Sequence, residues 1–398
     1  MTLKKYLQPI FDSRYHWLDY LVFLFIAGLF FTPILLQAAA GILFVILIFL
    51  FFRKNSPPLL PQHYLIFFYV VSAIITFLIT GQTLKELPKF LPHFILLSYI
   101  PISIYLSQKT QLKLDHWSGW IIICAGWAAL AGVLNFALGK ERTTTTFGGY
   151  FTLAALMGWS IPLTIGHFLE NKSKKSYWYI PLLLLQLFAL WFTFTRSAFL
   201  GLFAGFAIWF FQMLLGKRNL SKASLVRWVF ILSLPLLLLL LIFFSSDKRI
   251  NPISQGDQSQ TSTVDLSSGR KGIILDAVKV IKSDFENQDI GRMVFGHGLS
   301  SYRRLVTSPY ASWESDYLEI FMSQGVMGLI LLLLLYFYFL KAVWKGLRSR
   351  QVRLNGLAIS GIVFFVMSFF TLKLCSWHSG GIFLIILLML ESYPPQAD

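Results

Sequence analysis

The chain has 398 residues, of which 56% are hydrophobic and only 13% are charged, and its mean hydropathy is +0.66. Repeated apolar runs of roughly 20 residues, long enough to cross a bilayer, indicate an all-helical polytopic membrane protein and exclude a soluble globular one. Two cysteines, Cys124 and Cys375, form neither a metal-binding spacing nor a disulfide framework. The net charge is +16, but the basic residues are scattered among helix ends, which argues against nucleic-acid binding.

The hydropathy pattern predicts twelve membrane-spanning helices. The N-terminus resembles a signal peptide, with lysines before an apolar run and QAAAG at 37–41, but the apolar run resumes at 42–52, so we predict an uncleaved helical hairpin. The predicted spans are 17–33, 35–52, 62–80, 88–107, 116–138, 148–169, 176–194, 196–216, 225–245, 317–340, 354–373 and 376–392. They divide the chain into nine helices in 1–245, a long outer loop in 246–316, and three helices with a tail in 317–398.

The distribution of lysine and arginine predicts the orientation. The basic residues of the N-terminus and of the loops near 53–54, 109–113, 172–175, 217–227 and 341–353 fall on one side, which we assign to the cytoplasm together with both termini. The short outer loops carry a small charged set: Lys85, Glu86, Lys89, Lys140, Glu141, Arg142, Arg196 and Lys373. Topology does not require these outer bases, so they are candidates for function.

Arg196 stands at the junction of two predicted spans, where lipid makes a charge costly. Such an arginine can face a protein cavity and serve function, or it can snorkel to the interface from a helix end. Position alone leaves both interpretations open.

The long outer loop is predicted to contain an amphipathic helix over 270–285, with short helices over an outward-facing cavity. Its apolar residues recur at helical spacing, which suits the membrane surface or a cap on the bundle. They are Ile273, Ile274, Ala277, Val278, Ile281 and Phe285. Arg270 begins this helix, and free N–H groups at a helix start form a natural anion site. The glycine-rich turn GHGLSSY at 296–302 is a weaker signal, because such turns are common in loops.

Five motifs occur in an order that points to a known family. They are RTTTTFGGYFTLAALMG at 142–158, FTRSAFLG at 194–201, SGRKGIILDAVKVI at 268–281, FGHGLSSY at 295–302 and ESDYLEIFMSQGVMG at 314–328. Together they resemble the O-antigen ligase and polymerase superfamily, integral membrane glycosyltransferases of the bacterial periplasmic face. The last motif is similar to the family's His-Asn-x-Tyr-Leu motif with its Gly-x-x-Gly ending.

The resemblance implies transfer of a glycan from undecaprenyl diphosphate to an acceptor hydroxyl, in O-antigen or exopolysaccharide assembly at the inner membrane, with no metal or other cofactor. A lipid diphosphate leaving group needs fixed cations, and arginine offers bidentate contacts to phosphate oxygens. Matching motifs assign this role to Arg196 and Arg270, with Arg142 and Lys89 as further candidates that could equally be interfacial anchors. No Asp-x-Asp motif for a metal–nucleotide pair is present, which agrees with a lipid-linked donor. Expected partners are the donor, the acceptor, membrane lipids and other polysaccharide-assembly proteins.

Glu314 departs from the family pattern. It stands where the ligases carry a histidine thought to act as general base, and Ser315 stands in the asparagine place. A carboxylate can accept the acceptor-hydroxyl proton as histidine does, so the chemistry survives, and the change favours the polymerase branch. The alternative role for Glu314 is a salt bridge to a loop arginine.

Nearby residues are secondary candidates. Asp316 could share the base role or hold the base, and Tyr317 and His297 are expected to contact diphosphate or glycan. His297 and His378 are alternative bases on the outer face, where a hydrogen-bonded structural histidine is the simpler interpretation.

Two other classes of function fit parts of the pattern. A transporter or flippase for lipid-linked glycan would share many helices and outer arginines, but would more often show internal repeats and midplane charges. The one mid-helix polar break of note is His93 beside Pro92, which a packed histidine explains. An inert assembly partner would not need a long charged outer loop.

Overall fold

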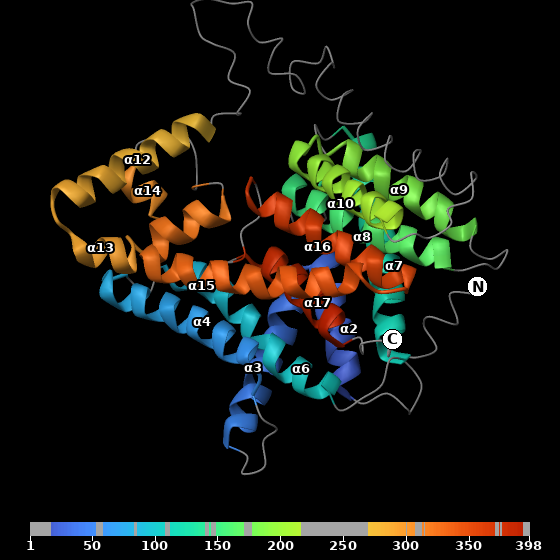
Figure 1. Cartoon of the computed structure of the whole chain (residues 1–398), viewed down its shortest axis with the longest axis horizontal. Coiled ribbons are helices and arrows are strands. Elements are labelled where there is room, and N and C mark those ends of the chain that lie inside the picture. Colours follow the sequence, from blue (N-terminus) through green and yellow to red (C-terminus); the bar gives the residue numbers. More distant parts are fainter. Residues whose placement is uncertain are drawn as a thin grey trace, which may run out of the picture.

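The computed structural model of the chain describes residues 17–52, 59–82, 86–107, 112–139, 143–144, 149–170, 177–215, 270–299, 301–306, 313, 315–370, 374 and 376–392. Within these ranges all regular structure is helical and no strand occurs (Figure 1). The predicted all-helical class is confirmed.

Long helices from both halves of the sequence make up the fold. The first half contains α2 (Trp17–Phe31), α3 (Pro33–Phe52), α4 (Pro61–Ile79), α5 (Leu87–Phe90), the 3-10 helix η3 (Leu91–Ser98), α6 (Tyr99–Ser107), α7 (Leu112–Ala137), α8 (Tyr150–Glu170), α9 (Tyr179–Trp191) and α10 (Arg196–Leu215). The second half contains α12 (Arg270–Glu286), α13 (Ile290–Phe295), α14 (Tyr302–Leu305), α15 (Asp316–Leu347), α16 (Val352–Ser368) and α17 (Trp377–Ser392).

Several of these helices are long and apolar enough to cross a membrane, so the chain is a multi-pass membrane protein. Six described segments meet that standard by length and composition: Pro33–Phe52, Pro61–Ile79, Leu87–Leu106, His116–Ala137, Tyr150–Glu170 and Asp316–Leu347. Shorter apolar helices occupy the other predicted spans, at Trp17–Phe31, Tyr179–Trp191, Arg196–Gln212, Val352–Ser368 and Trp377–Ser392. The predicted span 225–245 lies outside the described residues.

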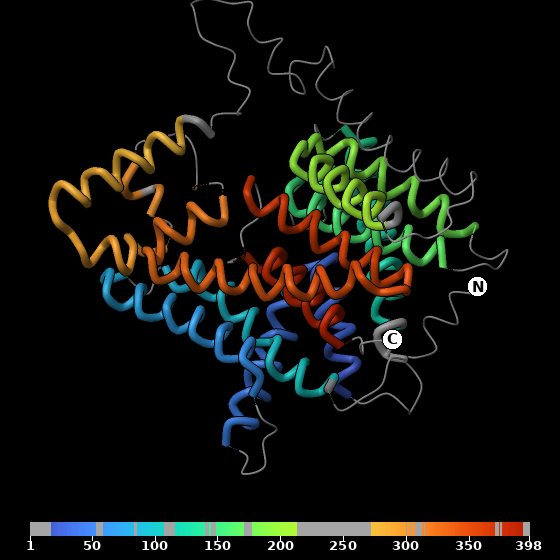
Figure 2. The backbone as a smooth tube through the Cα atoms, viewed as in Figure 1, coloured from blue at the N-terminus to red at the C-terminus, as the bar shows by residue number. Residues whose placement is uncertain are grey.

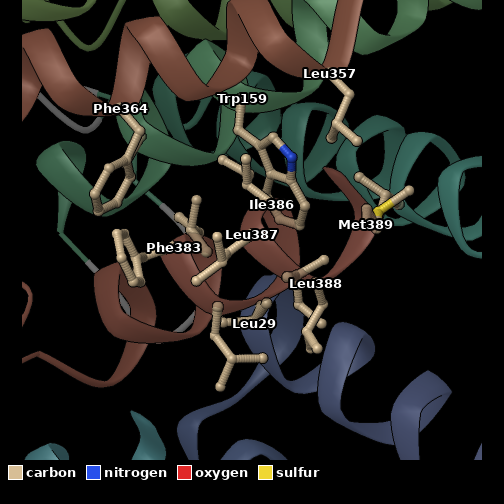
Figure 3. Close-up of a cluster of buried hydrophobic side chains, with 14 of the residues drawn as sticks. Leu29, Trp159, Leu357, Phe364, Phe383, Ile386, Leu387, Leu388 and Met389 are labelled. Atoms are coloured by element: carbon tan, nitrogen blue, oxygen red, sulfur yellow. The ribbon is translucent and has the colours of Figure 1, made fainter. Parts of the chain in front are cut away.

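Helix α17 forms the centre of the bundle. Every residue from Ser379 to Leu390 is buried, as expected for a helix that is apolar on all sides. Phe383 stacks on Phe339 of α15 with ring centroids 4.6 Å apart. Figure 3 shows this core, with side chains of α17 between the labelled Leu29, Trp159, Leu357 and Phe364.

Helix α16 lies against α10, and two glycines allow a close approach. A Cβ added at Gly201 would lie 3.0 Å from the Val363 carbonyl oxygen, and one at Gly205 would lie 2.7 Å from Cγ2 of Ile359. Small residues at such contacts are typical of membrane helix interfaces. The residue numbers rise along α10 as they fall along α16, so the helices are antiparallel. This register places the start of α10 level with the end of α16.

Helix α15 is broken at Gly325, and its two parts lie against each other. Gly325 has φ +69° and ψ −163°, a non-helical conformation. The hydroxyl of Tyr336 donates a hydrogen bond to Asp316, although the two residues would lie about 30 Å apart along a straight helix. Residues 316–324 therefore turn back along 326–336, and the tube in Figure 2 follows this reversal. The sequence predicted an uninterrupted span at 317–340, so this bend corrects that expectation.

The glycine-rich turn at 296–298 explains the break. Its backbone N–H groups at His297 and Gly298 donate to the carbonyl oxygens of Met322 and Ser323, both at 2.9 Å. These donors satisfy carbonyls that the interrupted helix leaves without their usual partners. The two segments touch so closely that a Cβ at Gly325 would lie 2.3 Å from the Val294 carbonyl oxygen.

Helices α12, α13 and α14 form an outer module that packs on the first part of α15. The predicted amphipathic helix is present as α12. Its residues Ile273 and Ala277 join a buried cluster with Tyr302, Trp313 and Met322. Figure 1 shows these three helices grouped at one end of the molecule, next to the ends of α4 and α15.

Replacing Gly325 with alanine is expected to destabilise this end of the fold. A non-glycine residue in such a conformation costs roughly 1–3 kcal/mol, and the overlap with Val294 adds to that cost. Thermal unfolding of the detergent-solubilised protein measures the effect. Gly272→Ala is the matched control, because nothing lies within 4 Å of the added Cβ at that position of α12. Equal melting temperatures for the two variants would contradict this account of the break.

Candidate functional site

The start of α15 is held in place from two sides. Asp316 is fully buried, and its Oδ1 accepts a hydrogen bond of 2.8 Å from the Leu374 N–H, while its Oδ2 accepts one from the Tyr336 hydroxyl. A buried carboxylate is stable only when its oxygens are satisfied in this way. Both Asp316 oxygens are occupied, so the geometry favours a holding role over the general-base role.

Tyr317 links the start of α15 to the end of α16. Its ring stacks on Phe369 with centroids 4.6 Å apart, and its hydroxyl lies 3.5 Å from the Ser368 Oγ. Tyr317 is partly exposed, whereas Asp316 beside it is buried. The two neighbours therefore differ, with Asp316 fixing the helix start and Tyr317 presenting an aromatic side chain next to the last turn of α16.

Arg196 lies at the same end of the bundle. It is the first residue of α10, which the antiparallel register with α16 places level with Ser368. The preceding turn is built from threonines and a strained residue. Thr193 Oγ1 donates to the Leu190 carbonyl at 2.7 Å and accepts from the Thr195 N–H at 3.3 Å, while Phe194 has φ +53°. Such local hydrogen bonds from side chains to the backbone fix the conformation of the turn, and therefore the direction in which the helix begins. Arg196 is partly exposed.

The segment after Arg142 is bound to the same turn. Arg142 itself lies outside the described residues, but Thr143 is buried and donates from its N–H to the Phe192 carbonyl at 3.1 Å and from its Oγ1 to the Ala189 carbonyl at 2.8 Å. The threonine-rich motif and the Arg196 motif, about 50 residues apart in the sequence, therefore meet at the end of α9.

Arg270 and Glu314 each lie close in sequence to a residue of the same buried cluster. Arg270 is the first residue of α12, and Ile273, one turn later, packs with Trp313, the residue before Glu314. Trp313 is fixed by a hydrogen bond of 3.0 Å from its Nε1 to the Ser301 Oγ. The Arg270 side chain and Glu314 lie outside the described part of the chain. Their neighbours show that the fold brings the two motifs together.

His297 braces the outer module. Its Nε2 lies 2.7 Å from Asp284 Oδ2, and the two side chains are only 7% and 10% exposed. Arg304 Nη2 donates to the His297 carbonyl at 2.7 Å. These contacts support the structural interpretation of His297 more than contact with substrate. Lys89 is exposed on α5, and its neighbour Phe90 packs with Leu299 of the outer module.

A buried polar network beside the break was not predicted. Gln324 accepts a hydrogen bond of 2.9 Å from the Ser72 hydroxyl and lies 3.2 Å from His93 Nε2, while His93 Nδ1 lies 3.1 Å from the Phe90 carbonyl. This network ties α15 to α4 and η3, and it gives His93 the packed role expected for it. The glycine directly after Gln324, inside an apolar helical pattern, is the signal that could have located it.

Glu319 is a second carboxylate in the folded-back part of α15. It lies one turn after Asp316 and is 8% exposed. Sequence reasoning did not select it. Among the described residues, no group of three or more His, Cys, Asp or Glu side chains is placed to hold a metal ion.

Comparison with known families identifies this region. Residues 181–333 match the family model described as O-antigen ligase. The resemblance to the O-antigen ligase and polymerase superfamily is confirmed. No curated protein matches the chain.

The O-antigen ligase match runs from α9 through the break in α15. It includes Arg196, Arg270 and Glu314, and it includes the turn at 296–298 that packs on Gly325. Arg142 and Lys89 lie outside it. The matched residues include α10, the outer module and the folded-back part of α15.

Proposed function

We propose that this protein is a glycosyltransferase that moves a glycan from undecaprenyl diphosphate to an acceptor hydroxyl at the periplasmic face of the bacterial inner membrane. The observation that carries the proposal is the O-antigen ligase match over residues 181–333, which contains both motif-matched arginines and Glu314. The match supports a membrane glycosyltransferase of surface polysaccharide assembly. The donor, the side of the membrane and the reaction course are our proposal.

The proposed reaction needs two kinds of group. Arg196 and Arg270 bind the diphosphate and stabilise the negative charge that grows as the bond between the anomeric carbon and the diphosphate oxygen breaks. Glu314 accepts the acceptor-hydroxyl proton while that oxygen attacks the anomeric carbon from the opposite face, which inverts its configuration. The diphosphate leaves with the bonding electron pair. The arrangement is supported by the starts of α10 and α15, which both lie beside the last turn of α16. Guanidinium groups more than about 15 Å apart in a donor-bound structure, well beyond hydrogen-bond reach of one diphosphate, would refute shared binding.

The proposed topology has twelve spans, with both termini in the cytoplasm and 246–316 outside. The described helices support it in one specific way. Helix α10 begins level with Ser368, at one end of the bundle, and runs toward the opposite end. The outer module lies at the end where α10 begins, because it packs on the first part of α15, and Tyr317 in that part contacts Ser368. The chain must return between residues 215 and 270, and the predicted span 225–245 would provide that crossing.

We favour a polymerase over a ligase, because Glu314 replaces the ligase histidine. A proteoliposome assay with lipid-linked oligosaccharide tests the function. A polymerase is expected to produce longer lipid-linked glycans from the donor alone, whereas a ligase forms product only when lipid A core is added. Glycan that crosses the bilayer but is neither lengthened nor transferred would show a transporter and overturn the proposal.

A further inference from the structure

Helix α12 presents two different apolar faces. Ile273 and Ala277 are each 1% exposed and pack inside the outer module. Ile274, Val278 and Phe285 are 55%, 53% and 71% exposed on the same helix. Packing within the module therefore accounts for only part of the amphipathic pattern.

The exposed residues lie along one side of the helix. Ile274, Val278 and Phe285 stand at positions i, i+4 and i+11, and together with Ile281, which is partly buried against the module, they form a row that we call the apolar stripe. Each residue of an α-helix is rotated by about 100° from the one before it, so the stripe lies about 100° around the helix from the buried face. Lys282, whose side chain is 73% exposed, borders the stripe, and Lys279, 79% exposed, lies on the polar face beyond it.

The helices that α12 adjoins through α13 also expose apolar side chains. Helix α13 joins α12 to α4 and α15, which are both candidate membrane spans. Near this contact those helices expose large apolar side chains, as does α13 itself. These are Leu78 (70%), Ile79 (57%), Ile290 (70%), Val326 (41%) and Ile330 (52%). Figure 1 shows α13 next to the ends of α4 and α15, with α12 following on from α13.

We propose that α12 is an interfacial helix whose apolar stripe enters the outer leaflet at the boundary between headgroups and acyl chains. An exposed apolar row with lysine on the neighbouring surface is typical of helices that lie on membranes, because a lysine stem packs on apolar surface while its ammonium group reaches the phosphates. A protein partner is a poorer fit, since lysine is depleted at protein interfaces. The inference rests on the proposed topology, which places residues 246–316 outside, but it does not depend on the transfer reaction.

Fluorescence in vesicles tests this inference. An environment-sensitive NBD label is attached at Val278→Cys, Ile274→Cys or Lys279→Cys in the full-length protein with Cys124→Ala and Cys375→Ala. The protein is reconstituted into phosphatidylethanolamine and phosphatidylglycerol vesicles that contain lipids with a doxyl quencher near the headgroup end of the acyl chain. The labels at 274 and 278 are expected to emit at shorter wavelength and to be quenched at least about twofold more than the label at 279, as for a helix lying in the interface plane.

Two outcomes would overturn the proposal. Equal, weak quenching at all three positions would place α12 in water. Blue-shifted emission at 274 and 278 without quenching would show that protein covers the stripe, either another segment of the chain or a second copy. The label at 279, one residue from 278 but on the polar face, separates membrane insertion from a general effect of labelling.

Discussion

Glu314→Gln is expected to lower turnover by about 10²–10⁴-fold, the usual contribution of a positioned general base. Glutamine keeps the shape of the side chain but cannot accept the acceptor-hydroxyl proton. Donor binding should persist, because the proposed contacts to the diphosphate come from the arginines. Single-turnover transfer and donor binding, measured on the same reconstituted protein, separate the two effects.

Two variants control this experiment. Glu286→Gln removes an exposed carboxylate of α12 that pairs with Lys282 at 3.6 Å, and it should transfer glycan at the normal rate. Glu314→His should retain partial activity if the position is equivalent to the ligase histidine. A normal rate for Glu314→Gln would move the base elsewhere, with Asp316 and His378 the next to be tested. Asp316 would then have to give up the hydrogen bond from Tyr336 or the one from Leu374.

Arg196→Lys is expected to reduce kcat/KM by about 10- to 100-fold, because hydrogen bonds to charged groups are worth roughly 1.5–3 kcal/mol. Lysine keeps the positive charge but loses the planar pair of donors that matches a phosphate. Arg348→Lys is the matched control, since Arg348 is exposed beyond the C-terminal end of α15. Kinetics of transfer with purified variants in proteoliposomes measure the change.

A double-mutant cycle tests whether Arg196 and Arg270 bind one diphosphate. If both contact the same group, the loss in Arg196→Lys/Arg270→Lys should differ from the product of the separate losses, as for residues that share a partner. Strictly multiplicative losses would indicate that the two arginines act at separate places. A full rate in the single Arg196→Lys variant would remove Arg196 from the site.

The helical frame could be predicted from the sequence because lipid leaves few solutions. Long apolar runs must become helices, and the predicted span boundaries 35–52 and 376–392 differ from α3 and α17 by at most two residues. The helical spacing of Ile273 and Ala277 likewise located α12. The site motifs came from family resemblance, and the family match over 181–333 agrees with that origin.

The folded-back start of α15 could not be predicted in the same way. Residues on both sides of Gly325 favour helix, so local pattern gives one continuous span. The break depends on donors from His297 and Gly298, about 25 residues earlier. The roles of Asp316 and Gln324 depend on partners still more distant in sequence, at Leu374 and Ser72. Local periodicity contains no information on such pairs.

The bond between Asp316 and Leu374 also has a consequence for how the protein is made. The ribosome completes the folded-back segment of α15 before it makes Leu374, 58 residues later. Until then one Asp316 oxygen lacks the partner that satisfies it in the finished protein, and an unsatisfied carboxylate is costly in an apolar surrounding. The hydrogen bonds that hold the start of α15 are therefore complete only after α16 and the residues that follow it have been made.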